Sequence, residues 1–311
     1  METYICIDIG GTNIRAALFP KGEIKPLLQE RITTQGENQT AEERLVEIIK
    51  RIWPQKDTVQ AMVVAAPGYI DTQKGVILKA VNIPDWVDLP LKKNLENIFN
   101  TQVFLGNDAR LAALGEWRYG SARGHHDVLY LTISTGIGGG VIIKDQMLMG
   151  SQGIATELGH VVINSNGEMC SCGHKGHLEA LASGKSIVEY VRTRIAAGES
   201  SSLVEKNIIS AKEIFQAAKT GDQLAIDAFK RAGRFLGIGV ANYLHIFNPS
   251  CVVLGGGVIQ SGDLIMKPFR ASLEEHILDN EYLKKLAITT AQLGDNAGLI
   301  GGLVLIELMM E

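Results

Sequence analysis

The segment 160–179 constrains this chain more than any other, because it gathers side chains of the kind that bind a metal ion. It contains two of the four cysteines and three of the seven histidines. Histidine and cysteine ligands in the spacing H-x9-C-x-C-x4-H can close a tetrahedral zinc shell with no open position. The spacing therefore predicts a structural zinc ion with four ligands: His160, Cys170, Cys172 and His177. His174 is an alternative fourth ligand.

Two acidic residues flank this metal segment. Glu157 lies just before His160, and Glu179 lies just after His177. When one ring nitrogen of a histidine binds zinc, the other nitrogen is left to donate a hydrogen bond. We therefore expect the metal to aim the second nitrogen of His160 at a hydroxyl of a small ligand. The two carboxylates are then placed to accept hydrogen bonds from neighbouring hydroxyls.

The bulk composition is that of a globular chain long enough for two domains. Of the 311 residues, 46% are hydrophobic and 21% are charged. A formal net charge of -4 argues against nucleic acid or an acidic membrane surface as a partner. The N-terminus shows no basic, apolar leader, and no apolar stretch reaches a membrane-spanning length. Four cysteines in so long a chain do not make a disulfide scaffold, so we expect a cytoplasmic protein.

Hydrophobic periodicity predicts an α/β protein in two parts. Strand, glycine turn and second strand occur at 4–19 and again at 128–143, which indicates a duplicated α/β unit. Helices are expected over 40–53, 91–99, 109–119, 185–197, 211–219, 222–247 and 297–310, and strands over 61–66, 103–105 and 251–254, with a loop at 82–86. A glycine-rich, basic turn at 120–124 suggests domains 1–119 and 120–296, with 297–311 packed on the first.

Three glycine clusters carry the pattern of phosphate-binding loops, because glycine lets backbone N–H groups approach an anion closely. The first holds Asp8, Gly10, Gly11, Thr12 and Asn13, the second Thr135 and Gly136, and the third Gly255, Gly256 and Gly257. Asp8 would repel a phosphate but can hold Mg²⁺ or its water shell. Each cluster alone is also compatible with a tight hairpin turn.

The order of elements around these glycines separates the nucleotide-binding classes. A strand rather than a helix follows Gly136-Ile137-Gly138, which disfavours a dinucleotide-binding fingerprint and hence an NAD-dependent dehydrogenase. The chain has no G-x-x-x-x-G-K-[ST] motif. Two hairpin loops and a third glycine loop match instead the nucleotide clamp of actin-like ATPases.

The pair Asn107-Asp108 follows a predicted strand and opens a predicted helix. A carboxylate there can take the proton of a hydroxyl that is being phosphorylated, and the helix dipole favours its ionised form. Asn107 can donate to and accept from neighbouring hydroxyls. The alternative is a helix N-cap with no role in catalysis.

Together these motifs resemble those of the ROK family of bacterial sugar kinases and repressors, and most closely its glucokinases, over nearly the whole chain. The corresponding segments are the phosphate loop at 8–12, the Asn-Asp pair at 107–108, the second phosphate loop at 135–139, the Glu-x-Gly-His motif at 157–160, the zinc motif at 170–179 and the Leu-Gly-Gly-Gly motif at 254–257. Gly68 and Asn82 correspond to loops near the sugar. One residue departs from the pattern, because His177 replaces the third cysteine of the zinc motif. Histidine is also a zinc ligand, so a His2Cys2 site is expected.

The resemblance implies an actin-like ATPase (ribonuclease H-like) fold, with two lobes around a nucleotide and sugar cleft. It implies an ATP- and Mg²⁺-dependent kinase that phosphorylates the 6-hydroxyl of glucose, with Asp108 as general base. The implied sugar-binding residues are Gly68, Asn82, Asn107, Asp108, Glu157, His160 and Glu179. It also suggests a homodimer or homotetramer.

Several alternatives remain open at this stage. Within the family, the sugar can be another hexose, such as fructose, mannose or N-acetylmannosamine, and the phosphoryl donor can be polyphosphate or ADP. A sugar-sensing regulator is the alternative from another class. Repressors of the family carry an N-terminal helix-turn-helix, and here the first phosphate-loop strand is expected to begin at about residue three, which leaves no room for one.

Overall fold

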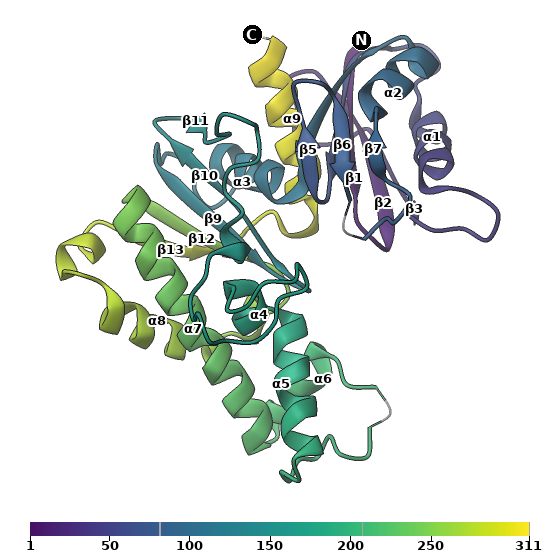
Figure 1. Cartoon of the computed structure of the whole chain (residues 1–311). Helices are drawn as coiled ribbons and strands as arrows, with labels where there is room; N and C mark the ends of the chain where they lie inside the picture. The colour runs from purple at the N-terminus through teal and green to yellow at the C-terminus, as the bar shows by residue number, and fades with distance from the viewer. Residues whose placement is uncertain (81, 207, 311) are drawn as a thin grey trace. The chain divides into compact units, whose positions relative to one another are not determined.

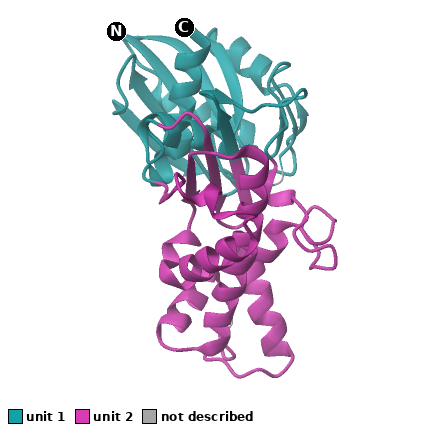
Figure 2. Ribbon diagram, turned by 90° about the vertical axis from the view of Figure 1, so that its left-hand side faces the viewer, with its two compact units in different colours: residues 1–124, 140–156, 292–311 teal, residues 125–139, 157–291 magenta. Residues whose placement is uncertain are grey.

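The computed structural model describes residues 1–80, 82–206 and 208–310, and these form two compact units. Unit 1 comprises residues 1–124, 140–156 and 292–311, and unit 2 comprises residues 125–139 and 157–291 (Figure 2). The division differs from the expected one at residues 120–124, 140–156 and 292–296, which group with unit 1.

Unit 1 is built on a five-stranded sheet in the order β3-β2-β1-β4-β8. The strands are β1 (Glu2–Ile9), β2 (Asn13–Pro20), β3 (Leu28–Thr33), β4 (Thr58–Ala66) and β8 (Gln102–Asn107). The first three strands pair antiparallel, and β4 and β8 continue the sheet parallel to β1. Because the central strands β1 and β4 are buried on both faces, their sequences are nearly continuous apolar runs. This is the strand–turn–strand expected at 4–19.

Helices α1 (Ala41–Ile52) and α2 (Leu91–Phe99) pack in this unit as their sequences predict. Thr40 caps α1 through a capping box with Glu43, which satisfies two backbone donors that the helix leaves free. Leu45, Ile48 and Ile49 recur at helical spacing and are fully buried in the core against the sheet.

The C-terminal helix α9 (Ala297–Met310) packs against α3 (Asp108–Tyr119), which follows β8. Small residues make this close approach possible. A Cβ added to Gly301 would lie 1.6 Å from the carbonyl oxygen of Leu111 in α3. Because α3 begins with Asp108, this helix pair helps to fix the position of that carboxylate.

A second, three-stranded sheet in unit 1 was not predicted. It has the order β5-β6-β7, with β5 (Tyr69–Asp71), β6 (Val76–Lys79) and β7 (Val87–Leu89). The strands are too short to show the period-two alternation that marks a strand in a sequence. Residues 82–86 form the connection from β6 to β7, as the loop expected there.

Unit 2 contains most of a second five-stranded sheet, whose order is β11-β10-β9-β12-β13. Its strands are β9 (Val128–Ile133), β10 (Ile137–Ile143), β11 (Gln146–Met147), β12 (Cys251–Gly255) and β13 (Ala287–Thr290). The helices of unit 2 are α4 (Leu178–Ala182), α5 (Gly184–Ala196), α6 (Ala211–Lys219), α7 (Gln223–Phe247) and α8 (Asp263–His276), with short 3-10 turns η1 (Leu158–His160), η2 (Ile259–Ser261) and η3 (Asn280–Leu283). A fourth turn, η4 (Gly294–Asn296), precedes α9 in unit 1.

Three helices of unit 2, α5, α6 and α7, lie close to their predicted ranges, whereas α4 and α8 were not predicted. The long helix α7 ends at Phe247, and its C-cap Asn248 adopts the left-handed conformation just before Pro249. Helix α8 packs along α7 (Figure 1), although it contains Pro268. A proline inside a helix removes a backbone donor and is an unfavourable local signal, so only the packing on α7 accounts for this helix.

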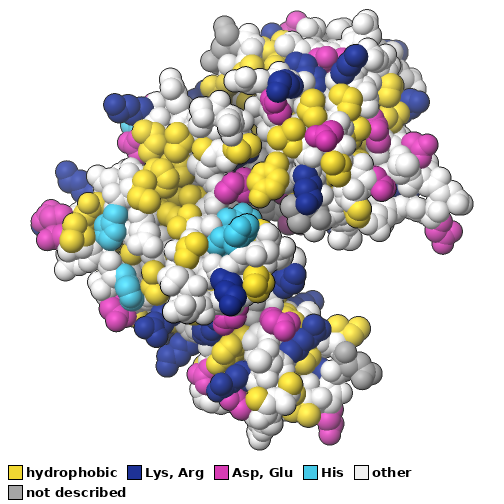
Figure 3. Space-filling model, in the orientation of Figure 1, with side chains coloured by type: hydrophobic (Ala, Val, Ile, Leu, Met, Phe, Trp, Pro, Cys, Tyr) yellow, Lys and Arg dark blue, Asp and Glu magenta, His cyan; other side chains and the backbone are white. Residues whose placement is uncertain are grey.

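Within residues 1–80, 82–206 and 208–310, no helix is both long and apolar enough to cross a bilayer. On the face drawn in Figure 3, acidic and basic side chains are interspersed rather than separated into two regions. This mixture agrees with the small formal net charge of -4.

We expect Gly301→Ala to destabilise unit 1, because its Cβ would overlap the backbone of α3 and push the two helices apart. The free energy of unfolding should fall by about 2 kcal/mol or more, as for other overpacked sites. Urea unfolding followed by circular dichroism measures this change. Leu308→Ala on the half-exposed side of the same helix is the control and should cost less than about 1 kcal/mol. Equal effects of the two substitutions would contradict the close packing of α3 and α9.

Candidate functional site

The turn between β1 and β2 forms the first glycine loop. Gly10 donates its N–H to the carbonyl oxygen of Asn13 at 2.8 Å, which closes the turn. Thr34 holds the turn from outside, since its hydroxyl donates to the Gly10 carbonyl at 2.6 Å and its N–H donates to the Thr12 carbonyl at 2.9 Å. The Thr12 side chain itself is exposed. A Cβ on Gly11 would lie 2.7 Å from the Cβ of Asn82, so Asn82 lies directly against this loop.

Asp8 lies at the end of β1, beside the loop, and pairs with Arg15 on β2. Only 15% of the Asp8 side chain and 20% of the Arg15 side chain are exposed. Burial raises the pKa of Asp8 above its usual value, and the positive charge of Arg15 opposes this rise. Arg15 therefore helps to keep a buried carboxylate ionised at the position where a hydrated Mg²⁺ would need it.

Asn107 and Asp108 lie where β8 ends and α3 begins. The Asn107 side chain accepts hydrogen bonds from the N–H groups of Ala109 and Arg110, so Asn107 is the N-cap of α3. Its amide also donates to the Gly68 carbonyl at 3.3 Å. Asp108 is half-buried, and one of its carboxylate oxygens accepts from the Ala109 N–H at 2.8 Å.

Strand register brings the predicted residues of unit 1 to one edge of the sheet. Asp8 on β1 is level with Ala65 on β4, and Ala65 is level with Gly106 on β8. The three strands are parallel, so the loops that follow them meet at the same edge. Neighbouring strands are about 4.8 Å apart, which places the ends of β1 and β8 about 10 Å from each other. The first glycine loop and the Asn107-Asp108 pair are therefore neighbours within unit 1.

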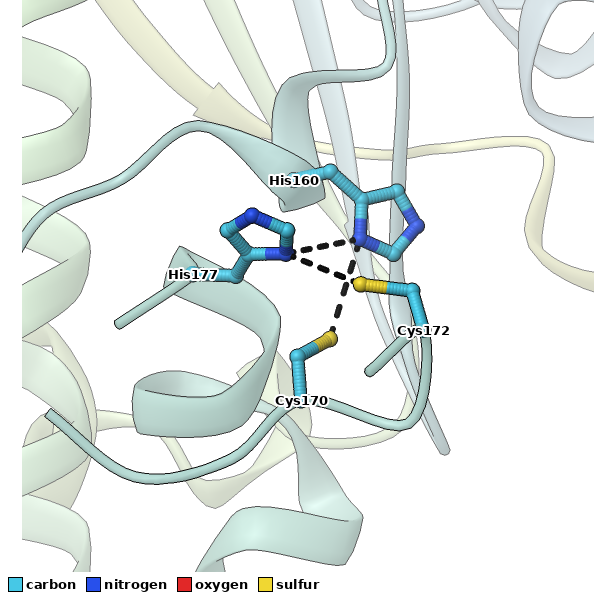
Figure 4. A group of neighbouring side chains, drawn as sticks. All are labelled: His160, Cys170, Cys172 and His177. Atoms are coloured by element: carbon cyan, nitrogen blue, oxygen red, sulfur yellow. Dashed lines mark hydrogen bonds between the residues drawn. The ribbon is translucent and has the colours of Figure 1, made fainter. Parts of the chain in front are cut away.

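The four predicted metal ligands converge in unit 2 (Figure 4). Their ligand atoms all lie within 4.8 Å of one another. The Nδ1 atoms of His160 and His177 are 3.3 Å apart, Cys170 Sγ is 3.7 Å from His160 Nδ1, and Cys172 Sγ is 3.2 Å from His177 Nδ1. A tetrahedral zinc ion with ordinary bond lengths separates two nitrogens by about 3.4 Å and nitrogen from sulfur by about 3.6 Å. The donor set therefore fits zinc.

Burial changes the pKa values of two of these side chains. It raises the pKa of the Cys170 thiol to about 11. A metal must therefore displace a proton from this sulfur, and it binds less tightly as the pH falls. The pKa of His177 is lowered by burial and by the neighbouring His160, which favours the neutral imidazole that a metal requires. His174 remains a nearby alternative, because its Nδ1 is 3.8 Å from Cys172 Sγ.

The outward nitrogen of His160 points away from the other ligands in Figure 4. His160 belongs to η1, which follows Glu157, and its N–H donates to the Glu157 carbonyl at 3.0 Å. Glu179 lies in the first turn of α4 and already accepts three hydrogen bonds, from the Ile137 N–H, the Ser171 hydroxyl and the Cys170 thiol. A carboxylate offers about four lone-pair sites, so Glu179 retains capacity for a ligand hydroxyl.

The second and third glycine loops are neighbours in unit 2. Thr135 and Gly136 form the turn between β9 and β10, and Gly255 to Gly257 follow β12. Val258 donates its N–H to the Ile133 carbonyl at 3.1 Å, which joins the two loops. Beside them lies a cavity of about 760 Å³, a size that accommodates a nucleoside. Its lining residues are Ser134, Thr135, Gly184, Lys185, Val188, Ser210, Ala211, Lys212, Phe215, Gln216, Phe229, Gly257, Val258, Gln260 and Ser261.

The sequence analysis missed several residues that line or support this site. Lys185 and Lys212 are the charged residues that line the cavity, and Phe215 adds an aromatic wall. The available signal was weak, namely a Ser-Gly-Lys start of a predicted helix at 183–185. Arg15 and Ser171 were also missed, because their partners become visible only once the strands and loops are placed.

Comparisons with known proteins identify the family of this chain. The sequence model of the ROK family matches residues 4–308. The chain belongs to the ROK family. It is 35% identical over 310 residues to the glucokinase of Thermotoga maritima, which covers 97% of this chain and 96% of the relative.

Solved structures of ROK family kinases are also similar to this chain over nearly its whole length. A ROK family glucokinase from Streptomyces griseus, in complex with glucose and AMPPNP, is 34% identical, with a TM-score of 0.83 and coverage of 97% of this chain and 98% of that one. The ROK hexokinase of Thermus thermophilus is 32% identical, with a TM-score of 0.82 and coverage of 99% and 100%. The mixed α/β fold is accordingly the actin-like ATPase fold that the glycine-loop pattern predicts.

We expect His177→Ala to lower the zinc content of the purified protein severely, whereas His174→Ala should leave it near one equivalent per chain. The physical reason is that His177 Nδ1 lies 3.3 Å from His160 Nδ1, at ligand spacing, and His174 lies outside the group of four. Elemental analysis of both variants measures the difference. Loss of the metal in His174→Ala with retention in His177→Ala would show that the fourth ligand is His174.

Proposed function

We propose that this protein is a glucokinase, which transfers the γ-phosphoryl group of ATP to the 6-hydroxyl of glucose. The proposal rests on one observation: the first glycine loop and the residues Asn107 and Asp108 lie close together at the same edge of the sheet in unit 1. The similarity of nearly the whole chain to a glucokinase solved with glucose and AMPPNP supports it. A hexose kinase needs both elements, because a base must meet a hydroxyl close to the transferred phosphoryl group.

Asp108 acts as the general base in this proposal. Its carboxylate accepts the proton of the 6-hydroxyl while the hydroxyl oxygen forms a bond to the γ-phosphorus. The bond between the γ-phosphorus and the oxygen bridging to the β-phosphate breaks, and ADP leaves. The cap formed by Asn107 and the packing of α3 on α9 hold the carboxylate in place.

The nucleotide is held by backbone groups and by the cavity. Residues 10–13, 135–136 and 255–257 present N–H groups and hydroxyls to the phosphates. The apolar cavity walls in unit 2, such as Phe215 and Val258, suit a nucleobase, and Lys185 and Lys212 suit the phosphates. Mg²⁺, bound with ATP, neutralises charge on the phosphate oxygens, and Asp8 would hold it or its water shell.

Zinc has a structural role in this proposal. His160, Cys170, Cys172 and His177 would hold it, and the closed set of four protein ligands leaves no position for substrate. Its contribution is to fix the zinc-bearing loop, so that His160 donates from its outward nitrogen to a sugar hydroxyl. Glu157 and Glu179 accept from other hydroxyls, and Gly68, Asn82 and Asn107 complete the sugar contacts. A cytoplasmic location and a homodimer or homotetramer remain predictions.

A matrix of sugars and phosphoryl donors tests the proposal directly. We expect the highest kcat/KM with glucose and ATP, and lower values with fructose, mannose, N-acetylmannosamine, polyphosphate and ADP. Coupled detection of the sugar phosphate measures each combination, with zinc content determined on the same sample. A preference for N-acetylmannosamine, or for polyphosphate, would replace the assigned substrate or donor but leave the kinase assignment intact. Absence of phosphoryl transfer to every sugar would reject the kinase.

We expect Asp108→Asn to lower kcat about 100-fold or more, because the amide cannot take the hydroxyl proton. The dissociation constant for glucose should change little, since an amide still accepts a hydrogen bond from a hydroxyl. Steady-state kinetics and calorimetry measure the two quantities separately. Asp263→Asn, which changes an exposed aspartate on α8, is the matched control. Turnover near the normal rate in Asp108→Asn would mean that another group is the base.

A further inference from the structure

Glu179 links two loops that the proposed function treats separately. The zinc loop is residues 160–177, and the nucleotide loop is residues 134–137 between β9 and β10. Glu179 follows the zinc loop directly in the first turn of α4. Its two carboxylate oxygens bind different loops, one each, within unit 2.

One carboxylate oxygen of Glu179 is hydrogen-bonded to the backbone of the nucleotide loop. Oε2 accepts a hydrogen bond from the Ile137 N–H at 3.0 Å. A Cβ added to Gly136 would lie 2.4 Å from the same oxygen, so the absence of a side chain at this position permits the contact. The carboxylate therefore fixes the loop at the residue that follows Thr135 and Gly136, and Thr135 lines the cavity in which the nucleotide is proposed to bind.

The other oxygen of Glu179 contacts the zinc loop between two metal ligands. Oε1 accepts from the Ser171 hydroxyl at 3.0 Å and from the Cys170 thiol, whose sulfur is 3.6 Å away. A zinc-bound cysteine is a thiolate and has no proton to donate. With zinc bound, the Ser171 hydroxyl is therefore the donor that remains between the zinc loop and Glu179.

The replacement of a third cysteine by His177 favours this contact electrostatically. Two thiolates and two neutral imidazoles balance the charge of a zinc ion, whereas a third thiolate would leave the site negative. A negative site would repel the Glu179 carboxylate, which lies within hydrogen-bond distance of Cys170. With His177 as a ligand, the loaded metal site would be neutral beside the Glu179 carboxylate.

We propose that Glu179 and Ser171 are positioning residues that couple metal occupancy to nucleotide binding. Zinc orders residues 170–172, Ser171 then holds Glu179, and Glu179 holds the nucleotide loop in its binding conformation. The inference rests on the proposed function, because it takes zinc and an adenine nucleotide as the occupants of the two sites. Removal of zinc then weakens nucleotide binding even without sugar, because the Glu179 carboxylate no longer holds the nucleotide loop in place.

Calorimetric titration with AMPPNP and Mg²⁺, in the absence of glucose, tests the coupling without a measurement of activity. In the unmodified protein, removal of zinc by a chelator should raise the dissociation constant for AMPPNP about tenfold, within the usual range of coupling between sites. In Ser171→Ala the zinc content should stay at one equivalent, and the ratio of the zinc-free to the zinc-loaded dissociation constant should fall towards one. Glu179→Ala should reduce the same ratio further. Ser165→Ala, an exposed serine on the same loop, is the matched control and should keep the ratio of the unmodified protein.

The outcomes separate this inference from the proposed function. If zinc and AMPPNP both bind but their affinities are independent, the proposed function stands and the coupling is overturned. A ratio in Ser171→Ala equal to that of the unmodified protein also overturns it, because the effect of zinc then takes another route. If the unmodified protein binds neither zinc nor AMPPNP, the proposed function fails and the coupling fails with it.

Discussion

The convergence of two imidazoles and two thiols on one point is the constraint on which the candidate site of unit 2 depends. These side chains come from a loop of irregular backbone, which has few apolar contacts of its own to hold it, since Val162 and Met169 are exposed. The short antiparallel bridges within the loop are isolated rather than part of a sheet. In the proposed function a zinc ion would supply this cross-link, and free energy from metal binding would then become folding free energy for the loop. The proposed role of His160 depends on that cross-link.

In unit 1, regular secondary structure fixes the positions of the polar site residues. Its chemistry-bearing residues lie at the ends of buried parallel strands and at the start of a helix, where register and capping fix the backbone. This arrangement buries the carboxylate of Asp8, and burial raises the pKa of that group. Arg15 on the neighbouring strand pairs with Asp8 and offsets the cost of burying the charge. The polar residues of unit 1 are therefore held by regular secondary structure, whereas those of unit 2 gather in a loop that would be held by the proposed zinc ion.

Local signals in the sequence predicted much of this structure, and the remainder depends on contacts between distant segments. The ranges of α2, α6 and α9 match their predictions because apolar spacing and end signals are encoded within each helix. The convergence of the four candidate metal ligands was also predictable, since their spacing in one short segment is itself the signal. The strands β5 to β7 were missed because they are stabilised by pairing with one another rather than by a local pattern. The lysines of the cavity, the Arg15 partner of Asp8 and the Ser171 contact of Glu179 were missed for the same reason, because no residue type or spacing distinguishes them before the chain is folded.

The account of unit 2 depends on a four-coordinate zinc ion with a mixed ligand set, and X-ray absorption at the zinc edge of the purified protein tests this most directly. We expect two sulfur scatterers at about 2.3 Å and two nitrogen scatterers at about 2.0 Å, with multiple scattering from two imidazole rings. Such a spectrum corresponds to His160, Cys170, Cys172 and His177 as the complete set. A shell with a water oxygen in place of one histidine, or with nitrogen and oxygen alone, would contradict a closed structural site and remove the basis for the fixed position of His160.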